Sequence, residues 1–461
     1  MRGYLKSLFR NAPAPVVEWA QIAYHFLPAR WRYGRSFTNA VRLLSESEHW
    51  AERDFIAYQE RLLEPLLKHC YENVPYYRSV FQERGISPRD IQGISDLDKL
   101  PYLTKETVRK KQKGLLAENI SFLDMEEAHT SGSSGTPLTF YMDRNTRPVD
   151  RALALRKLLW LGYKPGDRIA FFKGMPLANP AKFIRYFPGA RELRISFHNS
   201  DDKRLNDMLD AMQYYRPDFI DAWPSCLYIL AQWIAKTGRS IAPPRYILTA
   251  SENLYPHIRE KIEKTFHAPV IDWYGQEESV AIAMQCSQAK GYHIQPEMGV
   301  FELIPTDKPG LSEIVGTCLH NIAMPFLRYR TGDLAVKGDV QSCPCGRKHP
   351  LLEKVMGREA DFVLTPERNL VSPLILDFAF IQLDEIREAQ IIQEDIKTLR
   401  VRVVPWETLS ESTRATLLRE IRERLESPTM NIILDETDDI PRTEGGKRPF
   451  IISKLRTEDY L

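Results

Sequence analysis

The chain has 461 residues, of which 43% are apolar and 27% charged, a balance typical of a globular enzyme with more than one domain. The 63 basic and 61 acidic residues give a net charge of +2, so overall charge gives no reason to expect nucleic acid as a partner. Six cysteines are too few for a disulfide scaffold in a chain of this length.

The first forty residues are rich in basic and aromatic side chains. Six basic residues accompany a single acid, Glu18, and alternate with apolar residues such as Phe9 and Trp31. We favour a helix that packs on the body of the protein; the alternative is peripheral contact of residues 1–35 with an anionic membrane. The sequence has neither a secretory signal peptide nor an apolar run of about 18 residues, which predicts a cytoplasmic protein without a transmembrane segment.

The middle of the chain alternates between helical and extended patterns. Helices are predicted over 45–85, 149–160, 202–215 and 256–266, and strands over 168–172, 219–222, 246–248 and 270–273. Strands and helices that alternate at this spacing favour a parallel sheet with helices on its faces. Ligands of such sheets bind beyond the carboxyl ends of the strands.

The last hundred residues have a different pattern. Strands are predicted over 389–392, 399–404 and 431–434, and a capping box of Thr408 and Glu411 predicts the start of a helix between them. This pattern indicates a small α+β domain. We place its boundary with the preceding domain near residues 357–361.

The strongest local motif is a run of small and hydroxylated residues, Thr130-Ser131-Gly132-Ser133-Ser134-Gly135-Thr136, followed by Pro137 and Leu138. Glycines let backbone N–H groups approach an anion and hydroxyls add donors, which favours a phosphate-binding loop. The alternative is a flexible linker, although β-rich residues follow at once. Because no lysine follows the last glycine, the motif does not indicate a P-loop kinase.

Three further motifs are weaker when each is taken alone. Tyr274-Gly275-Gln276-Glu277-Glu278 follows a predicted strand, so its ring could lie against a base and its carboxylates could bind Mg²⁺; a solvated turn explains it equally well. Asp333 lies in a glycine turn, where a carboxylate can accept both hydroxyls of a ribose. Lys447 lies on a glycine-bearing loop that could bring its charge to a phosphate, although a single lysine near the end of a chain is usually solvated.

Two pairs of soft or borderline ligands suggest a metal site. Cys286 and His293 follow the Tyr274 motif, and Cys343 and Cys345 follow the Asp333 motif. Four such ligands can form a tetrahedral structural zinc site, although Cys-x-Cys is tighter than the usual spacing. The alternative is a set of unrelated cysteines and one satisfied histidine.

The order and spacing of these motifs resemble the adenylate-forming superfamily of acyl-CoA synthetases, luciferases and peptide-synthetase adenylation domains. The resemblance is closest to the phenylacetate–CoA ligase family and its relatives in capsular polysaccharide gene clusters. It extends from Pro75-Tyr76-Tyr77 through Thr249-Ala250-Ser251-Glu252 to Lys447. Cysteines and a histidine at similar positions recur in that family.

The resemblance implies an α/β fold with a large N-terminal adenylate-forming domain, built from parallel-rich sheets and helices, and a small mobile α+β C-terminal domain. Residues 1–120 would form the helical part of the large domain, and 121–356 the part that binds nucleotide and acid. Residues 357–361 would be the hinge, and 362–461 the domain that carries Lys447.

The resemblance also implies roles for single residues. The run from Thr130 to Thr136 would hold the β- and γ-phosphates of ATP, Tyr274 would stack on adenine, and Glu278 would ligate Mg²⁺. Asp333 would hold the ribose, Arg358 would reach the nucleotide, and Lys447 would bridge the acyl carboxylate and the α-phosphate. Further nucleotide contacts would come from Ser251, Glu252, Gly275, Gln276 and Glu277, and candidates for the acid pocket are Trp223, Pro224, Tyr228 and Ala250. Glu277 and Ala360 depart from the family, which often has Thr and Asp there.

The implied reaction is ATP-dependent activation of a carboxylic acid to an acyl-AMP, with release of pyrophosphate, followed by transfer to a thiol. CoA is the favoured acceptor, and a carrier protein or an amine is the alternative. A second alternative is a protein that binds nucleotide or acid without catalysis. A role in capsule polysaccharide biosynthesis follows from the resemblance alone.

Overall fold

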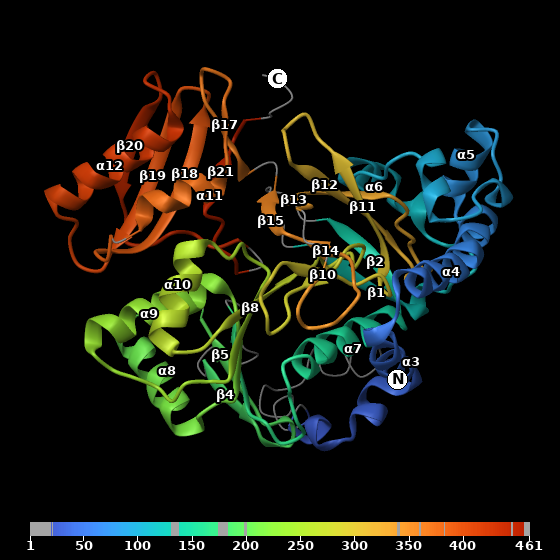
Figure 1. Cartoon of the computed structure of the whole chain (residues 1–461), viewed down its shortest axis with the longest axis horizontal. Helices are drawn as coiled ribbons and strands as arrows, with labels where there is room; N and C mark the ends of the chain where they lie inside the picture. Colours follow the sequence, from blue (N-terminus) through green and yellow to red (C-terminus); the bar gives the residue numbers. More distant parts are fainter. Residues whose placement is uncertain are drawn as a thin grey trace.

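The computed structural model describes residues 20, 22–130, 138–173, 183–197, 201–338, 342–358, 361–381, 383–443 and 446–455. A large N-terminal domain carries a smaller C-terminal domain, drawn in orange and red at the upper left of Figure 1. The predicted fold class is therefore confirmed. No helix among the described residues is long and apolar enough to span a membrane.

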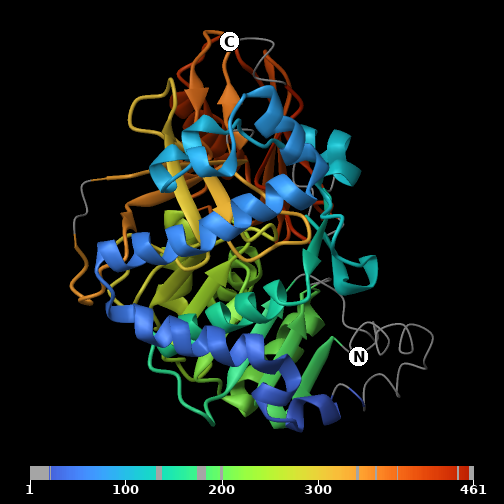
Figure 2. The ribbon, with the colours of Figure 1, turned by 90° about the vertical axis from the view of Figure 1, so that its right-hand side faces the viewer.

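Helices dominate the start of the described chain, as predicted for 45–85. They are α3 (Ala29–Glu46), α4 (Glu52–Asn73), α5 (Pro75–Glu83) and the short α6 (Lys105–Lys111). Figure 2 shows α3 and α4 in blue, lying across one side of the molecule. Phe37, Ala40 and Leu44 of α3 pack into the core, which agrees with the favoured interpretation for this part, whereas Trp31 is exposed. Residues 1–19 lie outside the described chain, and membrane contact stays a prediction.

A nine-stranded sheet, ordered β14-β10-β9-β8-β7-β6-β3-β5-β4, forms the centre of the large domain. Five neighbouring strands from β5 to β8 run parallel, as predicted, and antiparallel pairs close both edges. The strands are β3 (Ile169–Lys173), β4 (Ile184–Phe187), β5 (Glu192–Ser196), β6 (Phe219–Ala222), β7 (Tyr246–Ala250), β8 (Val270–Tyr274), β9 (Ala283–Met284), β10 (Tyr292–Ile294) and β14 (Leu351–Leu352).

Side chains point to alternate faces along each strand, and because both sets are apolar, helices cover both faces of this sheet. Ile220 and Ile247 pack under α8 (Asp202–Tyr215), α9 (Pro224–Thr237) and α10 (Pro256–Phe266). Their neighbours Phe219 and Leu248 face the opposite side, where Leu158 of α7 (Thr146–Leu159) joins them. The predicted helices at 202–215 and 256–266 match the structure.

Two antiparallel units complete the large domain. β1 (Met125–His129) pairs with β2 (Thr139–Asp143) in a hairpin, which the sequence indicated only through its β-rich second strand. A four-stranded sheet then joins β11 (Gly299–Pro305), β12 (Ser312–Cys318), β13 (Tyr329–Val336) and β15 (Lys354–Arg358). Both units pack against α4 and α5 in one apolar core.

The C-terminal domain is a small α+β unit, as predicted. Its sheet, ordered β20-β19-β18-β21, contains β18 (Ile386–Asp395), β19 (Thr398–Pro405), β20 (Asn431–Glu436) and β21 (Ile451–Ser453). It also contains β16 (Val363–Leu364), β17 (Leu370–Val371) and two helices, α11 (Pro373–Asp377) and α12 (Glu411–Leu425). The predicted capping box is wrong, because Ser410 is the N-cap of α12 and its hydroxyl accepts from the Thr413 N–H at 3.2 Å. The carboxylate that accepts from the Ser410 N–H belongs to Glu385, so a distant residue replaces the local box.

Candidate active site

One cavity of about 1230 Å³ lies between the two domains. The parallel strands β6, β7 and β8 all end at this cavity, because the carboxyl ends of parallel strands meet at one edge of a sheet. Residues of β13, β15 and the C-terminal domain form the remaining walls. The position agrees with the ligand site expected for a sheet of this kind.

The cavity collects the residues that the sequence singled out. Every described member of the predicted nucleotide and acid sets lines it: Thr130, Trp223, Pro224, Tyr228, Ala250, Ser251, Glu252, Tyr274, Gly275, Gln276, Glu277, Glu278, Asp333, Arg358 and Lys447. Ser131, Gly132, Ser133, Ser134, Gly135 and Thr136 lie outside the described residues. Their roles toward a ligand remain predictions.

The base of the predicted phosphate loop is fixed by the β1–β2 hairpin. The backbone N–H of Thr130 donates to the carbonyl of Leu138 at 3.0 Å, and the N–H of Leu138 donates to the Thr130 hydroxyl at 2.9 Å. Thr130 therefore belongs to the hairpin as well as to the cavity wall.

Tyr274 and Asp333 form one hydrogen-bonded unit. Tyr274 ends β8 and donates its hydroxyl to Oδ2 of Asp333 at 2.8 Å. The Asp333 N–H donates to the Thr331 hydroxyl at 3.0 Å, and Nε of Arg358 lies 3.5 Å from Oδ1 of the same carboxylate. Burial and the neighbouring Asp333 charge raise the pKa of Tyr274, so its hydroxyl stays protonated and keeps donating. A carboxylate held by Tyr274 and Arg358, on a backbone fixed by Thr331, is suited to a defined hydroxyl pair.

Glu278, the last residue of the Tyr274 motif, is buried, with 5% of the residue exposed. It accepts a hydrogen bond of 2.8 Å from the hydroxyl of Tyr329, and burial together with Glu278 raises the pKa of that tyrosine. Lys105 lies nearby and donates to the Thr331 carbonyl at 3.1 Å. Burial lowers the pKa of Lys105, and the charges of Asp333 and Glu278 oppose this change. No sequence motif marked Lys105, which lies near these residues because Leu103 forms a bridge with Tyr329.

Lys447 brings the C-terminal domain to the cavity. Its backbone N–H donates to the Thr443 hydroxyl at 3.1 Å, and its carbonyl accepts from the Thr443 N–H at 2.9 Å. Burial lowers the pKa of Lys447, while the nearby Glu252 carboxylate raises it. Glu252 in turn accepts from the Ser225 N–H, in the first turn of α9, at 3.0 Å. In this arrangement a cation of one domain faces the acids of the other.

The remaining candidates line the N-terminal end of α9. Trp223 is its N-cap and is buried, and Pro224 is its first residue. The Tyr228 ring lies 5.2 Å from the ring of His257. His257 contacts Asp377 of the C-terminal domain at 2.6 Å, so this wall of the cavity also joins the two domains.

The four predicted metal ligands come together. Their ligand atoms all lie within 4.8 Å of one another, with 3.5 Å between the sulfurs of Cys286 and Cys343 and 3.5 Å between Cys345 Sγ and His293 Nε2. Zn–S bonds of about 2.3 Å and Zn–N bonds of about 2.0 Å place the ligands of a tetrahedron roughly 3.5–3.8 Å apart. β10, which carries His293, pairs with both β9 and β14 and thereby brings the two cysteine segments together. The donor set fits zinc, and the two distances of 3.5 Å match those of such a tetrahedron.

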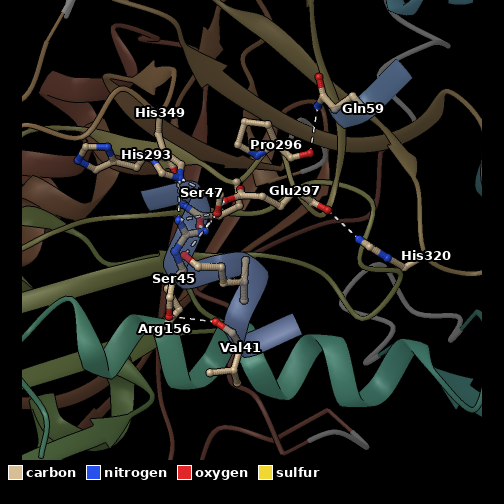
Figure 3. Close-up of polar contacts among 12 residues, drawn as sticks. Val41, Ser45, Ser47, Gln59, Arg156, His293, Pro296, Glu297, His320 and His349 are labelled. Atoms are coloured by element: carbon tan, nitrogen blue, oxygen red, sulfur yellow. Dashed lines mark hydrogen bonds and ion pairs between the residues drawn. The ribbon is translucent and has the colours of Figure 1, made fainter. Parts of the chain in front are cut away.

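A buried polar network lies beside this cluster, as Figure 3 shows. Arg156 of α7 donates to Oε1 of Glu297 at 2.6 Å, and Glu297 also accepts from Ser47, at the end of α3. His349 Nε2 lies 3.5 Å from the same carboxylate oxygen. Burial opposes the ionisation of Glu297, but Arg156 and His349 outweigh it and lower its pKa to about 2. The network joins four segments that are distant in sequence.

The chain is similar to known proteins over its C-terminal part and over most of its length. A family described as the CapK C-terminal domain matches residues 363–454. Protein CapK of Staphylococcus aureus is 23% identical over 443 residues, which cover 92% of this chain and 94% of that protein. A phenylacetate-coenzyme A ligase of Thermus thermophilus is 25% identical over 433 residues, covering 85% of this chain and 94% of the relative.

Solved structures of similar fold include a 2-hydroxyisobutyryl-CoA ligase with a bound acyl-AMP. In its postadenylation state it is 19% identical, with a TM-score of 0.70, and the alignment covers 89% of this chain and 92% of that one. In its thioesterification state the same ligase, 20% identical, gives a TM-score of 0.58 at 89% and 91% coverage. These likenesses concern the fold.

Proposed function

Since the chain belongs to the adenylate-forming superfamily, and within it to the group of phenylacetate–CoA ligases and CapK, we propose that it converts a carboxylic acid to an acyl-AMP and then to a CoA thioester. The class of enzyme is an AMP-forming acid–thiol ligase. The acid, the acceptor and the roles of single residues are the proposed parts.

The observation that carries the proposal is the shared cavity. Tyr274, Glu278 and Asp333 of the large domain and Lys447 of the small domain all line it. A nucleotide site formed by one domain and completed by a lysine of the other fits a reaction in which two anions must meet. A protein that only binds nucleotide has no need of such a lysine.

In the first half-reaction an oxygen of the acid attacks the α-phosphorus of ATP. The new P–O bond forms the acyl-AMP, and the bond to the β-phosphate breaks, so that pyrophosphate leaves. Lys447 would lie between carboxylate and α-phosphate and reduce their repulsion, an effect that in a fixed, water-poor site commonly contributes several kcal/mol. Asp333 would hold the ribose and Tyr274 the adenine. Glu278 would hold Mg²⁺, which when bound would neutralise phosphate charge.

In the second half-reaction the thiol of CoA attacks the acyl carbon, and AMP leaves with the electron pair of the broken C–O bond. The thiol needs the space that Lys447 fills, so the C-terminal domain would rotate about a hinge near residues 357–361. The higher TM-score with the postadenylation state than with the thioesterification state supports the interpretation that the described arrangement is the adenylating one.

The acid would lie against Trp223, Pro224, Tyr228 and Ala250, at the end of the cavity next to α9. Zinc at Cys286, His293, Cys343 and Cys345 would have a structural role. All four protein ligands would be satisfied, and the ion would link the segment after the Tyr274 motif to the segment after the Asp333 motif.

ATP–pyrophosphate exchange across a panel of aryl, short-chain and hydroxy acids tests the proposal. Lys447→Ala should reduce exchange by about 100-fold or more. Lys454→Ala is the matched control, because Lys454 is an exposed lysine of the same domain that pairs with Glu394. Acceleration of AMP release by free CoA distinguishes CoA from a carrier protein or an amine as the acceptor. A chain that binds no ATP would refute the proposal.

A further inference from the structure

We propose that the buried pair of His257 and Asp377 holds the C-terminal domain in the arrangement that places Lys447 in the cavity. The two side chains would thus be positioning residues for the adenylation step. This inference rests on the proposed function and deepens it, because it names the contact that favours the first half-reaction over the second. Both residues lie on the wall of the cavity, where the two domains meet.

The two partners belong to different domains. His257 is the second residue of α10, whose Ile262 and Phe266 pack into the core of the large domain. Asp377 is the last residue of α11, and its neighbour Leu376 packs into the core of the C-terminal domain. Nδ1 of His257 lies 2.6 Å from Oδ2 of Asp377. Each side chain is anchored in its own domain, so the contact joins the two.

Burial makes this contact costly to lose. The side chains of His257 and Asp377 are 10% and 1% exposed. The Tyr228 ring of α9 meets the His257 ring edge to face, with 5.2 Å between the ring centroids. Burial raises the pKa of Asp377, and the contact with His257 opposes this change. Removal of one partner from a buried pair leaves the other without compensation, which costs far more than the loss of an exposed pair.

A second pair on the same helix shows the contrast. Lys261, one turn after His257, donates to Oδ1 of Asp384 in the C-terminal domain at 2.9 Å. The Lys261 and Asp384 side chains are 27% and 80% exposed, so water can replace their contact at low cost. The buried bond from Gln232 to the Ile386 carbonyl supports the same arrangement as the His257 pair. The buried contacts, and not the exposed pair, therefore fix the domain.

Lys447 is tied to Asp377 through the core of the C-terminal domain. Leu376, next to Asp377, and Ile451, four residues after Lys447, belong to the same apolar cluster. A domain held at Asp377 consequently holds the lysine as well. In this arrangement the charge of Glu252, in the large domain, acts on Lys447. The thiol step needs the space that Lys447 fills, so the His257–Asp377 contact would break before that step.

The alternative is that His257 binds the acid directly, since it lines the cavity. A residue that only binds the acid has no effect on where the C-terminal domain lies when no substrate is present. A positioning pair, in contrast, changes the position of the domain with or without substrate. The two interpretations therefore differ in a measurement on the ligand-free chain.

The distance between spin labels on the two domains is that measurement. Labels at Tyr214→Cys of α8 and Glu411→Cys of α12 would occupy positions where the native residue is 93% exposed and the native side chain is 95% exposed, respectively. In the full chain, His257→Leu should shift or broaden the distribution of distances. Lys261→Leu is the matched control on the same helix and should leave the distribution unchanged. The chain without the two introduced cysteines serves as the labelling blank.

The two half-reactions provide the functional readout. His257→Leu should slow ATP–pyrophosphate exchange about tenfold or more, because fewer molecules hold Lys447 in the cavity. Thioester formation from supplied acyl-AMP should stay at the wild-type rate or rise. His257→Gln, whose amide can still donate to the Asp377 carboxylate, should recover part of the exchange. Lys261→Leu should match the wild type in both assays.

The outcomes separate this inference from the proposed function. If the wild type formed no acyl-AMP, the proposed function would fail, and the label distances would still decide the role of the pair. Distances in His257→Leu equal to those in Lys261→Leu would overturn that role. Equal losses in both half-reactions would also overturn it, because they would indicate general damage to the site. Should His257→Leu not fold, Asp377→Asn, which removes the charge on the other side of the contact, decides by the same comparison.

Discussion

Replacing Glu297 by glutamine is the sharpest test of how the large domain is held together. The Arg156 and Glu297 side chains are 3% and 1% exposed, and their closest N–O distance is 2.6 Å. The change keeps the size of the side chain but leaves Arg156 with a buried, uncompensated charge. Removal of one partner of such a pair is costly, whereas exposed pairs contribute little.

The magnitude follows from the pKa of Glu297. Its value of about 2 lies roughly 2.5 units below the ordinary 4.5, and at about 1.4 kcal/mol per unit this corresponds to about 3 kcal/mol of unfolding free energy. Loss of one partner from other buried pairs costs about 3–5 kcal/mol, which agrees. Because the folded pKa is lowered, this contribution is complete above pH 4.5 and is lost as pH falls toward 2.

Urea unfolding followed by tryptophan fluorescence measures the effect, since Trp160 lies 4.8 Å from the Arg156 guanidinium. Glu297→Gln should lose about 3 kcal/mol at pH 7 and should show a flatter decline below pH 4.5 than the wild type. Glu46→Gln is the control: the Arg42–Glu46 pair is 74% and 61% exposed, so its loss should cost less than about 1 kcal/mol. Equal losses for the two variants, or identical pH profiles for Glu297→Gln and the wild type, would refute the reasoning.

Three further outcomes test the site. Lys447→Ala should block acyl-AMP formation but leave thioester formation from supplied acyl-AMP largely intact, as single-turnover assays of each half-reaction would measure. Tyr274→Phe removes the hydrogen bond to Asp333, worth about 1 kcal/mol, so the dissociation constant for ATP should rise about fivefold; an unchanged constant would contradict this. Purified chain should contain one zinc ion, and Cys345→Ser should lower both the zinc content and the melting temperature. Substoichiometric zinc in the wild type would refute the metal site.

Local sequence patterns predicted the helices that are buried on one face and exposed to solvent on the other. The helices at 202–215 and 256–266 have an apolar face toward the sheet and a polar face outward, so their periodicity is visible in the sequence. Helix α9 was missed for the opposite reason. Most of its residues are buried, and Gln232 donates to the Ile386 carbonyl of the C-terminal domain at 2.8 Å. A helix covered on most sides has no polar stripe to reveal it.

The residues of the site were likewise predicted only in part. Tyr274, Asp333 and Lys447 were identified because motif order marks them within the chain. Arg147 and Lys105 were not, because the contacts that place their side chains, to Glu277 and to Thr331 respectively, are with residues far along the sequence. The sequence of α7 gives no sign of such a contact. Only the fold reveals side chains of this kind.

The two halves of the cavity are held by interactions of different strength. The half in the large domain rests on buried bonds, such as those from Tyr329 to Glu278 and from Tyr274 to Asp333. The C-terminal domain is held in part by exposed ion pairs: in Lys236–Glu407 and Lys261–Asp384 the acids are 78% and 80% exposed. Such pairs contribute little and can exchange with water at low cost, whereas the buried bonds cannot. Buried contacts also cross this boundary, from Gln232 to the Ile386 carbonyl and between His257 and Asp377. Withdrawal of Lys447 in the proposed cycle would therefore have to break these buried contacts as well as the exposed ion pairs.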